Sequence, residues 1–273
     1  MLRCGRFLLP LDFPLIMGVV NITPDSFSDG GQFLSAQAAI AQAERLVSEG
    51  AAILDLGAES TRPGAALVSE DEELARLLPV LEALQGLEVP VSVDTRRARV
   101  MLEVLAAGAS MINDIEALSG PGSLEAVAAS GCGVCLMHMQ GAPATMQVAP
   151  HYDDVVAEVG AFLAARAAAV ESAGISRDRI VVDPGFGFGK TVAHNLELLR
   201  YLPRMAVSGL PVLAGLSRKA TLGALTGRLA VERMPASIAA ALLAAQRGAT
   251  ILRVHDVAAT RDALAVWRAV EAR

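Results

Sequence analysis

Eight short apolar runs recur along this chain, and they constrain its fold more than any other feature of the sequence. Each run is followed by polar or glycine-rich residues and then by a segment rich in Ala, Leu, Glu and Arg, such as 35–49 and 152–173, which have helical length. Strand-like runs that alternate with helical segments predict parallel β-α-β units. The runs are 15–20, 53–57, 89–93, 110–112, 134–137, 180–182, 212–216 and 250–254.

Eight such units in 273 residues predict an α/β fold of the (β/α)₈ or TIM-barrel type. A doubly wound parallel sheet is the alternative, but that fold usually has fewer strands and often a G-x-G-x-x-G or Walker loop after its first strand. Neither pattern follows residues 15–20. Because no linker, low-complexity block or shift in composition interrupts the chain, we expect one domain over residues 1–273.

The balance of charged and apolar residues argues against several classes of protein. The formal net charge is −6, which disfavours general nucleic-acid binding because such proteins need a basic face. Although 53% of the residues are hydrophobic, the sequence has no run of about 18 uninterrupted apolar residues that could span a membrane. Pro10, Asp12 and Pro14 interrupt the first apolar stretch, which also lacks a cleavage pattern, so we read no signal peptide. We expect neither a nucleic-acid nor a membrane partner.

The three cysteines predict a reduced, cytoplasmic setting, because their number is odd and low for a chain of this length. Cys132 and Cys135 have C-x-x-C spacing, but no second Cys or His pair lies at zinc-finger spacing. Cys135 also lies inside an apolar run. We therefore expect these two cysteines to be buried and structural.

Polar or soft side chains follow every one of the eight runs. In a barrel of this type the active site lies at the C-terminal ends of the strands, so these side chains are expected to meet at one rim. A single Asp, Asn or Thr at such a place is often only a turn former or a helix N-cap, and for Thr95, Asp114 and Asp256 that alternative stays open. The full set is Asn21, 59–64, 94–96, Asn113 and Asp114, 137–139, 183–190, 217–219, and 253–256.

One part of this rim suits a planar heterocycle that is rich in N–H donors. Asp94, Asn113 and Asp183 offer hydrogen-bond acceptors, and Lys219 can donate to a ring carbonyl or nitrogen. Ser217 is better read as a hydrogen-bond donor than as a nucleophile, since no base lies beside it in the sequence.

A second part of the rim suits an anionic group and an aromatic one. Arg253, His255 and Asn21 supply donors for an anion. The glycine-rich segment 185–189 permits close backbone approach and carries Phe186 and Phe188 as possible stacking surfaces. These features predict a substrate with a heterocyclic part and an anionic part.

The motifs that carry these residues resemble those of the dihydropteroate synthases, the folate-pathway enzymes that sulfonamides inhibit. The resemblance covers nearly the whole chain and implies a TIM barrel, usually a homodimer. It also implies an activity: condensation of 6-hydroxymethyl-7,8-dihydropterin pyrophosphate with p-aminobenzoate to 7,8-dihydropteroate and pyrophosphate. The motifs are, in order, "MGVVNITPDSFSDGG", "GAESTRPGA", "SVDT", "IND", "LMHMQGAPATMQ", "DPGFGFGKTVAHN", "GLSRKATLG" and "RVHDV".

The same resemblance implies roles for individual residues. Those similar to the pterin-binding set are Asp94, Asn113, Met137, Asp183, Lys219 and Arg253. Those similar to the diphosphate-binding set are Asn21, Thr61, Arg62, Arg253 and His255. Those similar to the p-aminobenzoate pocket are Phe27, Pro63, Phe188 and Ser217. Catalytic roles fall to Asp94, Asp183, Lys219, Arg253 and Asp25.

The resemblance further implies Mg²⁺ at the diphosphate end, with Asn21 as its protein ligand. This ion keeps most of its waters and binds through substrate phosphates with few protein ligands, so one amide oxygen is sufficient. Loss of pyrophosphate would leave a methylene cation delocalised into the pterin, which Asp94 and Asp183 could stabilise electrostatically. Our hypothesis is therefore an SN1-like substitution without a covalent enzyme intermediate.

The segment "NITPDSFSDGG", residues 21–31, has the Gly, Pro and polar content of a loop that orders over a substrate. We expect a mobile lid here that closes together with residues 60–64, with Asp25 helping to orient the incoming amine. The alternative is a static polar loop in which Asp25 is only a turn residue.

Three rivals stay open at this point. A methyltetrahydrofolate-binding methyltransferase domain would share the Asp and Asn set but would not need the STRPG segment or the anion site of Arg253 and His255. A non-catalytic pterin-binding paralogue is the second. A phosphate-binding isomerase is the third, and it would need a base for which Glu59 is the only candidate. Because Asp55 and Glu59 share strand parity, we expect both to form ion pairs in the barrel interior.

Overall fold

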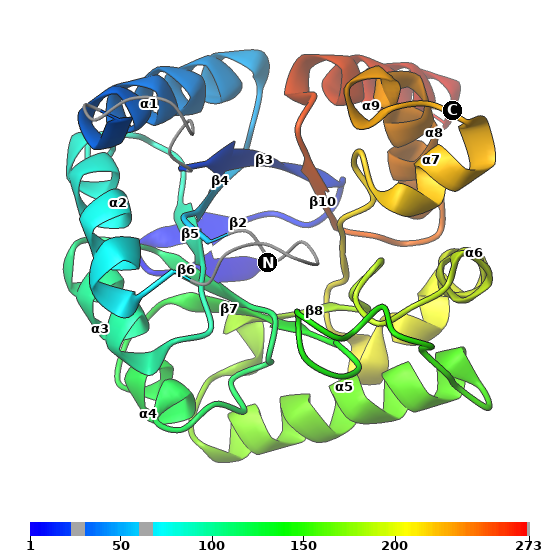
Figure 1. Ribbon diagram of the computed structural model, residues 1–273, viewed down its shortest axis with the longest axis horizontal. Coiled ribbons are helices and arrows are strands. Elements are labelled where there is room, and N and C mark those ends of the chain that lie inside the picture. Colours follow the sequence, from blue (N-terminus) through cyan, green and yellow to red (C-terminus); the bar gives the residue numbers. More distant parts are fainter. Residues whose placement is uncertain (23–30, 60–67, 272–273) are drawn as a thin grey trace.

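The computed structural model describes residues 1–22, 31–59 and 68–271. Eight parallel strands form the predicted barrel, and helices surround it (Figure 1). The strands are β3 (Leu15–Asn21), β4 (Ile53–Gly57), β5 (Val91–Asp94), β6 (Met111–Asp114), β7 (Gly133–Met137), β8 (Ile180–Asp183), β9 (Leu213–Ala214) and β10 (Ile251–Val254). Each of the eight apolar runs of the sequence therefore overlaps a barrel strand.

The barrel closes between β8 and β9, which lie at the two ends of the strand order β8-β7-β6-β5-β4-β3-β10-β9. A parallel bridge joins Val182 to Val212, and the amide of Val182 donates to the carbonyl of Pro211 at 3.0 Å. β9 is shorter than the predicted strand 212–216, because the chain turns between Leu216 and Lys219 instead of continuing along the barrel.

The helices follow the strands as the alternating pattern predicts: segment 35–49 lies in α1, and segment 152–173 contains α5. No helix among the described residues is long and apolar enough to cross a membrane. The α-helices are α1 (Gly31–Glu49), α2 (Glu70–Ala83), α3 (Ala98–Ala106), α4 (Ser123–Ala128), α5 (Val155–Ser172), α6 (Val192–Arg200), α7 (Ala220–Thr226), α8 (Met234–Gln246) and α9 (Val257–Glu271). The 3₁₀ helices are η1 (Arg177–Arg179), η2 (Leu202–Met205), η3 (Val207–Gly209) and η4 (Ala230–Glu232).

The inside of the barrel has an apolar level and, above it, a polar level. Side chains alternate between the two faces of a strand, so residues two apart point the same way. The apolar level consists of Met17, Ile53, Met111, Cys135, Val181, Leu213 and Ile251, all completely buried. Two positions further along four of these strands lie Asp55, Asn113, Asp183 and Arg253. The apolar residues thus fill the barrel, and the polar residues lie at its C-terminal mouth.

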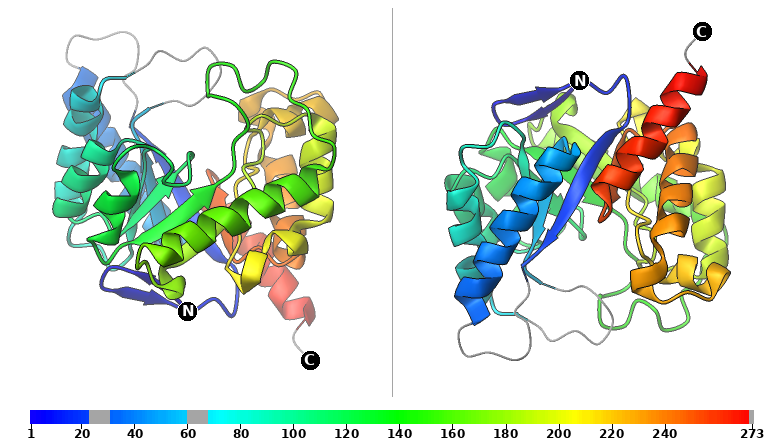
Figure 2. Two further views of the ribbon diagram at one scale, coloured as in Figure 1. Left: turned by 90° about the horizontal axis from the view of Figure 1, so that it is seen from below. Right: turned by 90° about the horizontal axis from the view of Figure 1, so that it is seen from above.

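A short antiparallel hairpin closes the other end of the barrel. Its strands are β1 (Leu2–Cys4) and β2 (Phe7–Leu9), and Leu2 and Cys4 pack into the apolar level. Both side views place this hairpin at the opposite end from the residues that follow β7 (Figure 2). A Cβ on Gly133 would lie only 2.8 Å from Cys4 Sγ, which explains the glycine there. The sequence analysis did not predict the hairpin, because three-residue strands show no useful periodicity.

Candidate active site

Arg253 joins two carboxylates across the mouth of the barrel. Its Nε donates to Asp55 Oδ2 at 2.6 Å, and its Nη2 donates to Asp94 Oδ2 at 3.0 Å. Asn113 Nδ2 donates to the same Asp55 oxygen at 3.2 Å. Strands β4, β5, β6 and β10 therefore bring together three of the residues expected to bind the pterin. Asp55 lies at the centre of the group, and its expected ion pair inside the barrel is confirmed.

Burial and the neighbouring charges together set the pKa values of these groups. It raises the pKa of Asp94 to about 7, with Asp55 adding to the shift and the Arg253 charge opposing it. Burial also works against the charge of Arg253, but the carboxylates of Asp55 and Asp94 outweigh it and raise the pKa of the guanidinium further. Asp55 itself is completely buried, and its Oδ1 has no hydrogen-bond partner among the described residues. Arg253 is thus a permanent cation that holds one buried carboxylate and faces a second that titrates near neutrality.

Asp183 is the last residue of β8, and its side chain binds the loop that follows. Its Oδ1 accepts a hydrogen bond from the amide of Gly185 at 2.7 Å, so the second oxygen can serve as an acceptor for a ligand. Burial raises the pKa of Asp183, and the positive charge of Lys219 opposes that rise.

Lys219 reaches the same loop from the segment after β9. Its Nζ donates to the carbonyl of Phe186 and lies 4.7 Å from the ring centroid of Phe188, a cation–π distance. Burial lowers the pKa of Lys219 to about 8, while Asp183 opposes the change. The expectation that Phe186 offers a stacking surface is wrong, because its side chain is 1% exposed and packs in the core. Phe188 is only partly buried.

The glycine-rich loop is fixed against the segment after β7. Gly185 has φ +68°, and a Cβ there would lie 1.9 Å from the carbonyl oxygen of His138. The buried ammonium of Lys190 contacts His138 Nδ1 at 2.9 Å and donates to the carbonyls of Gly185 at 3.0 Å and Phe188 at 2.9 Å. The sequence analysis placed Lys190 at the rim but missed this role. The only signal was a lysine that ends the alternating Gly-Phe pattern.

The remaining described residues of the predicted site lie at the ends of β3, β7, β9 and β10. Ser217 Oγ accepts from the amide of His255 at 3.2 Å and lies 2.9 Å from His255 Nδ1. Asn21 ends β3, which pairs with β10, and its Oδ1 lies 4.0 Å from the position that a Cβ on Gly57 would take. Met137 ends β7 and is 4% exposed. Those residues expected for the pterin and the diphosphate that the structure describes thus lie at the C-terminal mouth of the barrel.

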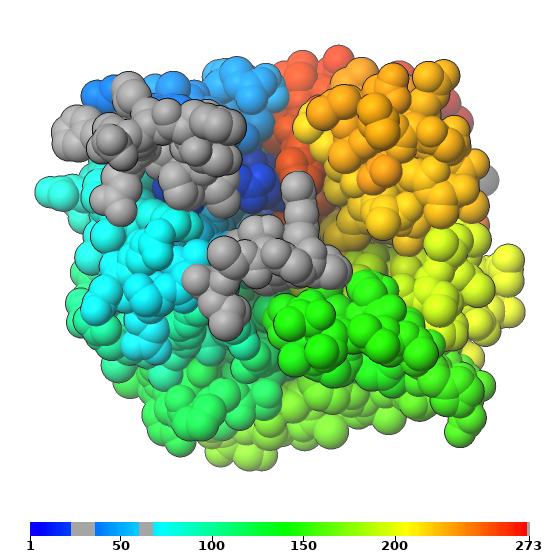
Figure 3. Space-filling view, viewed as in Figure 1, coloured from blue at the N-terminus to red at the C-terminus, as the bar shows by residue number. Residues whose placement is uncertain are grey.

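Several predictions fall outside the described residues and stay predictions. They concern Asp25 and Phe27 in segment 23–30, and Thr61, Arg62 and Pro63 in segment 60–67. The lid that we expect over the site involves the same two segments. In the space-filling view, the residues after β7 (green) and those of α7 and α8 (orange) lie at the edge of the face that is turned toward the viewer (Figure 3).

Glu59 forms the expected ion pair, but not in the barrel interior, so its expected location is wrong. Its Oε1 accepts from Arg97 Nη2 at 3.1 Å, and Arg97 also pairs with Glu73 on α2. The same Arg97 nitrogen donates to the carbonyl of Val68 at 2.6 Å. β4 ends at Gly57, so the alternation that would turn Glu59 inward no longer applies there.

The three residues that could be either turn formers or site residues all have contacts within the protein: Asp114 and Thr95 bind backbone amides within four residues, whereas Asp256 pairs with an arginine of another loop. Asp114 accepts from the amides of Glu116 and Leu118, both at 2.8 Å. Thr95 Oγ1 accepts from the amide of Arg97 at 3.4 Å. Asp256 pairs with Arg218 at 2.6 Å.

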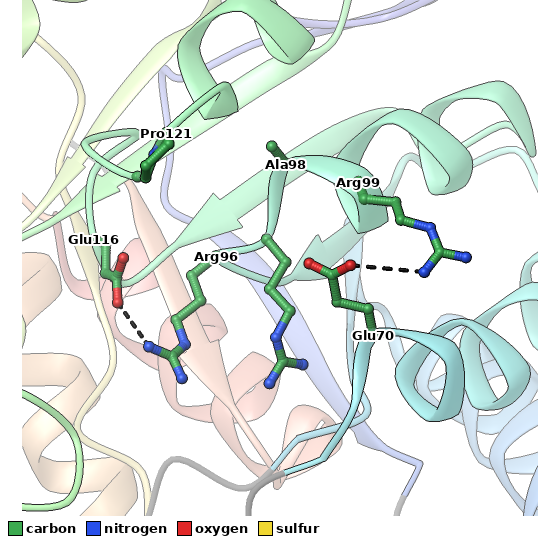
Figure 4. Close-up of a pocket in the computed structure, with 8 residues that line it drawn as sticks. Glu70, Arg96, Ala98, Arg99, Glu116 and Pro121 are labelled. Atoms are coloured by element: carbon green, nitrogen blue, oxygen red, sulfur yellow. Dashed lines mark hydrogen bonds and ion pairs between the residues drawn. The ribbon is translucent and has the colours of Figure 1, made fainter.

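An open cavity of about 320 Å³ lies beside the arginines that follow β5, outside the barrel mouth (Figure 4). Arg96 points toward Glu116, with Nη1 and Oε1 2.9 Å apart, and Arg99 points toward Glu70 at 3.6 Å. Arg97 is held by acidic residues in the same way. Because each arginine is paired with a carboxylate, this cavity lacks the excess positive charge that an anion site needs.

The metal-ligating groups at the barrel mouth suit a metal ion that is bound mainly by a substrate. Within the described ranges, no three or more His, Cys, Asp or Glu residues are placed to hold a metal. Asn21 offers a single, exposed amide oxygen at the mouth. That arrangement suits Mg²⁺ bound chiefly through phosphate oxygens and water, and it does not suit a metal held by a cage of protein ligands.

The chain is similar to known proteins over nearly all of its length. Residues 17–255 match a family model described as "Pterin binding enzyme". Identity is 54% with the dihydropteroate synthase of Neisseria meningitidis serogroup B, covering 98% of this chain and 96% of that protein. It is 51% with the dihydropteroate synthase of Escherichia coli, covering 96% and 93%.

Two solved structures extend the similarity to the fold. Dihydropteroate synthase of Xanthomonas albilineans with 4-aminobenzoic acid has a TM-score of 0.91 at 57% identity and covers 97% of this chain and 96% of that one. That of Burkholderia cenocepacia complexed with 7,8-dihydropteroate has a TM-score of 0.91 at 53% identity and covers 98% and 95%. This chain therefore belongs to the dihydropteroate synthase family of pterin binding enzymes.

Proposed function

We propose that this protein is a transferase that joins 6-hydroxymethyl-7,8-dihydropterin pyrophosphate to p-aminobenzoate, giving 7,8-dihydropteroate and pyrophosphate. The observation that carries the proposal is the cluster of polar side chains at the barrel mouth, in which Asn113 and Asp183 are buried and Asp94, Lys219 and Arg253 are partly buried. Relatives at more than 50% identity have been solved with 4-aminobenzoic acid and with 7,8-dihydropteroate. Similarity to dihydropteroate synthases over nearly the whole chain also disfavours the methyltransferase and the non-catalytic alternatives.

In this proposal the polar group recognises the pterin by matching its donors and acceptors. Asp94 and Asp183 accept hydrogen bonds from ring N–H groups, Asn113 offers its amide, and Lys219 donates to the ring carbonyl or a ring nitrogen. Met137 lies against the ring. Such a site discriminates strongly, because a ligand without the matching groups would leave buried carboxylates unpaired.

The diphosphate end would lie where β3 and β10 end side by side. Asn21, Arg253 and His255 supply groups there that can bind a phosphate-bound Mg²⁺ or the anion itself. Mg²⁺ on the diphosphate would make pyrophosphate a better leaving group. As the C–O bond breaks, the carboxylates of Asp94 and Asp183 face the positive charge that develops on the pterin methylene. The neutral amine of p-aminobenzoate then attacks the methylene carbon and gives up a proton to the released pyrophosphate or to water, in the SN1-like order that the sequence analysis predicts.

The p-aminobenzoate would lie between the glycine-rich loop and the segment after β9. Phe188 offers a partly exposed ring there, and Ser217 a hydroxyl next to His255. The remaining expected contacts, Phe27 and Pro63, lie outside the described residues.

Product formation tests the proposal directly. The purified protein is incubated with both substrates and Mg²⁺, with and without EDTA, and dihydropteroate is identified by its mass. Product that depends on the metal supports the proposed reaction. Tight pterin binding without product would instead indicate a binding paralogue.

The pH dependence of kcat/KM for the pterin substrate is expected to be bell-shaped, with a maximum between about 7 and about 8. Asp94 is needed as a carboxylate, and its pKa is raised to about 7, so activity is lost as the pH falls through that value. Lys219 is needed as an ammonium, and its pKa is lowered to about 8, so activity is lost as the pH rises through that value.

The substitution Asp94→Asn separates this effect from titration of the substrate. The variant is expected to be less active and to lose the acidic limb of the kcat/KM profile while keeping the basic limb. An acidic limb that is unchanged in Asp94→Asn would assign it to the diphosphate or to another group.

We also propose that the protein is a homodimer. The α7–α8 region, residues 220–246, gathers five exposed large apolar side chains, as interfaces do: Leu225, Leu229, Val231, Met234 and Leu243. α7 and α8 lie next to one another on one side of the barrel (Figure 1).

Light scattering of wild-type protein, Val231→Glu and the control Val148→Glu tests the dimer. Val231 and Val148 are similarly exposed, at 77% and 78%, but only Val231 belongs to the α7–α8 region. We expect a dimer for the wild type and for Val148→Glu, and dissociation for Val231→Glu. A monomeric wild type, or a dimer that Val231→Glu leaves intact, would refute this interface.

A cytoplasmic location is proposed on the state of the cysteines. Cys4, Cys132 and Cys135 are all free and buried, as expected for the last two. Burial raises the pKa of each thiol, that of Cys4 to about 12, which keeps them unreactive. Fractionation of the source cells, followed by detection of the protein, tests the location.

A further inference from the structure

Arg218 lies between two predicted site residues, Ser217 and Lys219, in a backbone conformation that is unusual for arginine. Its φ is +58°, in the left-handed region. The amide of Lys219 donates to the carbonyl of Leu216 at 3.2 Å, so Arg218 is the third residue of a four-residue turn. A positive φ at that position favours glycine, because the Cβ of any other residue crowds the following carbonyl. An arginine there needs other interactions to hold it.

The surrounding structure supplies those interactions. The amide of Arg218 donates to Ser237 Oγ at 2.9 Å, and its carbonyl accepts from Arg233 Nη1 at 3.0 Å. Its guanidinium donates through two nitrogens to the two oxygens of Asp256, at 3.2 Å and 2.6 Å. Bidentate pairing of this kind fixes the orientation of the two side chains as well as their distance. The Asp256 side chain is 15% exposed, so solvent screens this pair less than an ordinary surface ion pair.

The pair also aligns two loops residue by residue. Ser217 contacts His255, and the next residue of each loop forms the Arg218–Asp256 pair. The residue after Arg218 is Lys219, whose Nζ reaches Phe186 and the ring of Phe188. The left-handed turn therefore decides where the side chains on both sides of Arg218 lie.

We propose that Arg218 is a positioning residue for the proposed reaction. Held in the left-handed region by Asp256, it sets the places of Ser217 and Lys219 relative to the barrel mouth without touching the substrate. The inference rests on the proposed function, and it adds to that function a residue that neither the motif pattern nor the contacts of the mouth itself assigns.

The substitutions Arg218→Ala and Arg218→Gly separate the conformation of the turn from the side chain. Both remove the guanidinium, but only glycine adopts a positive φ without strain. We expect kcat/KM of Arg218→Ala to fall by about tenfold or more, with a raised KM for the pterin substrate, because the unlocked turn moves away from φ +58°. For Arg218→Gly, kcat/KM should lie within roughly threefold of the wild-type value. Equal losses in the two variants would overturn the proposal, since they would indicate that the guanidinium itself is needed.

Ser208→Gly is the matched control. Ser208 is exposed and has φ +52°, but it lies in η3, outside the mouth. We expect this variant to melt at the same or a higher temperature than the wild type, with unchanged kcat and KM. A comparable change in KM in Ser208→Gly would mean that relief of backbone strain acts on the whole fold, which would also overturn the proposal.

A double-mutant cycle tests the part assigned to Asp256. Asp256→Asn should lower kcat/KM in the wild-type background and have little further effect in Arg218→Gly, where no guanidinium is left to hold. Additive effects would show that Asp256 does not act through Arg218.

Crystal structures of the two variants test the positioning role independently of the proposed reaction. If the wild type forms no dihydropteroate, the proposed function fails, but the position of Lys219 Nζ can still be compared between Arg218→Ala and Arg218→Gly. We expect a displaced Lys219 in the alanine variant and a wild-type position in the glycine variant. An unmoved Lys219 in both variants would refute the positioning role.

Discussion

Replacing Arg253 with alanine is expected to lower kcat/KM for the pterin substrate on the order of 10²- to 10³-fold, as loss of a central charged donor does in other active sites. It should also lower the free energy of unfolding by about 3–5 kcal/mol, because removing one partner leaves a buried charge uncompensated. Arg253 bonds to Asp55 at 2.6 Å and to Asp94 at 3.0 Å, and Asp55 is completely buried. Steady-state kinetics and urea denaturation measure the two effects.

A second substitution separates the two effects. In Arg253→Ala/Asp55→Asn the buried charge is gone, so stability should recover substantially while activity stays low. Arg253→Lys keeps the charge but not the two-pronged geometry, and it should lie between the wild type and Arg253→Ala. If the double variant regained activity together with stability, Arg253 would be a structural residue only.

Replacing Gly185 with alanine is expected to lower kcat/KM by on the order of 10²-fold, the effect of moving reacting groups by about 1 Å. The new Cβ would lie 1.9 Å from the carbonyl oxygen of His138, so backbone must move to make room. The loop that moves carries the Phe186 carbonyl and the Phe188 ring, both of which contact Lys219. Steady-state kinetics with each substrate varied in turn measure the loss.

Gly174→Ala is the control for this substitution. Gly174 has φ +91°, but a Cβ there would meet no atom within 4 Å, and the residue lies before β8, at the other end of that strand from Asp183. It should lose about 1–2 kcal/mol of stability, from the backbone conformation alone, and keep normal kinetics. If Gly185→Ala behaved like Gly174→Ala, the contact with His138 would not position the loop.

The sequence predicts the barrel and most of its mouth because both follow from simple periodicities. Parallel strands buried on both faces appear as apolar runs, and the residues at their C-terminal ends meet at one rim. That reasoning correctly places Asp94, Asn113 and Arg253 together and assigns Asp55 its ion pair.

The features that the sequence does not predict depend on local backbone geometry. Glu59 was expected inside the barrel, but β4 ends two residues earlier and the alternation stops. Phe186 and Phe188 look equivalent in the sequence, yet the glycine-rich turn buries the first and leaves the second partly exposed. The left-handed turn at Arg218 has no glycine to reveal it.

Equilibrium binding of dihydropterin pyrophosphate to the wild type and to Asp183→Asn tests most directly whether the polar cluster at the barrel mouth recognises the pterin. Asp183 uses one oxygen for the amide of Gly185. An asparagine can keep that bond, but it then presents an N–H group to a ligand donor. Titration calorimetry without p-aminobenzoate should show tight binding to the wild type and on the order of 10²-fold weaker binding to Asp183→Asn. Equal affinities would contradict the account, because the pterin would then be bound equally well without one of the carboxylates proposed to recognise it.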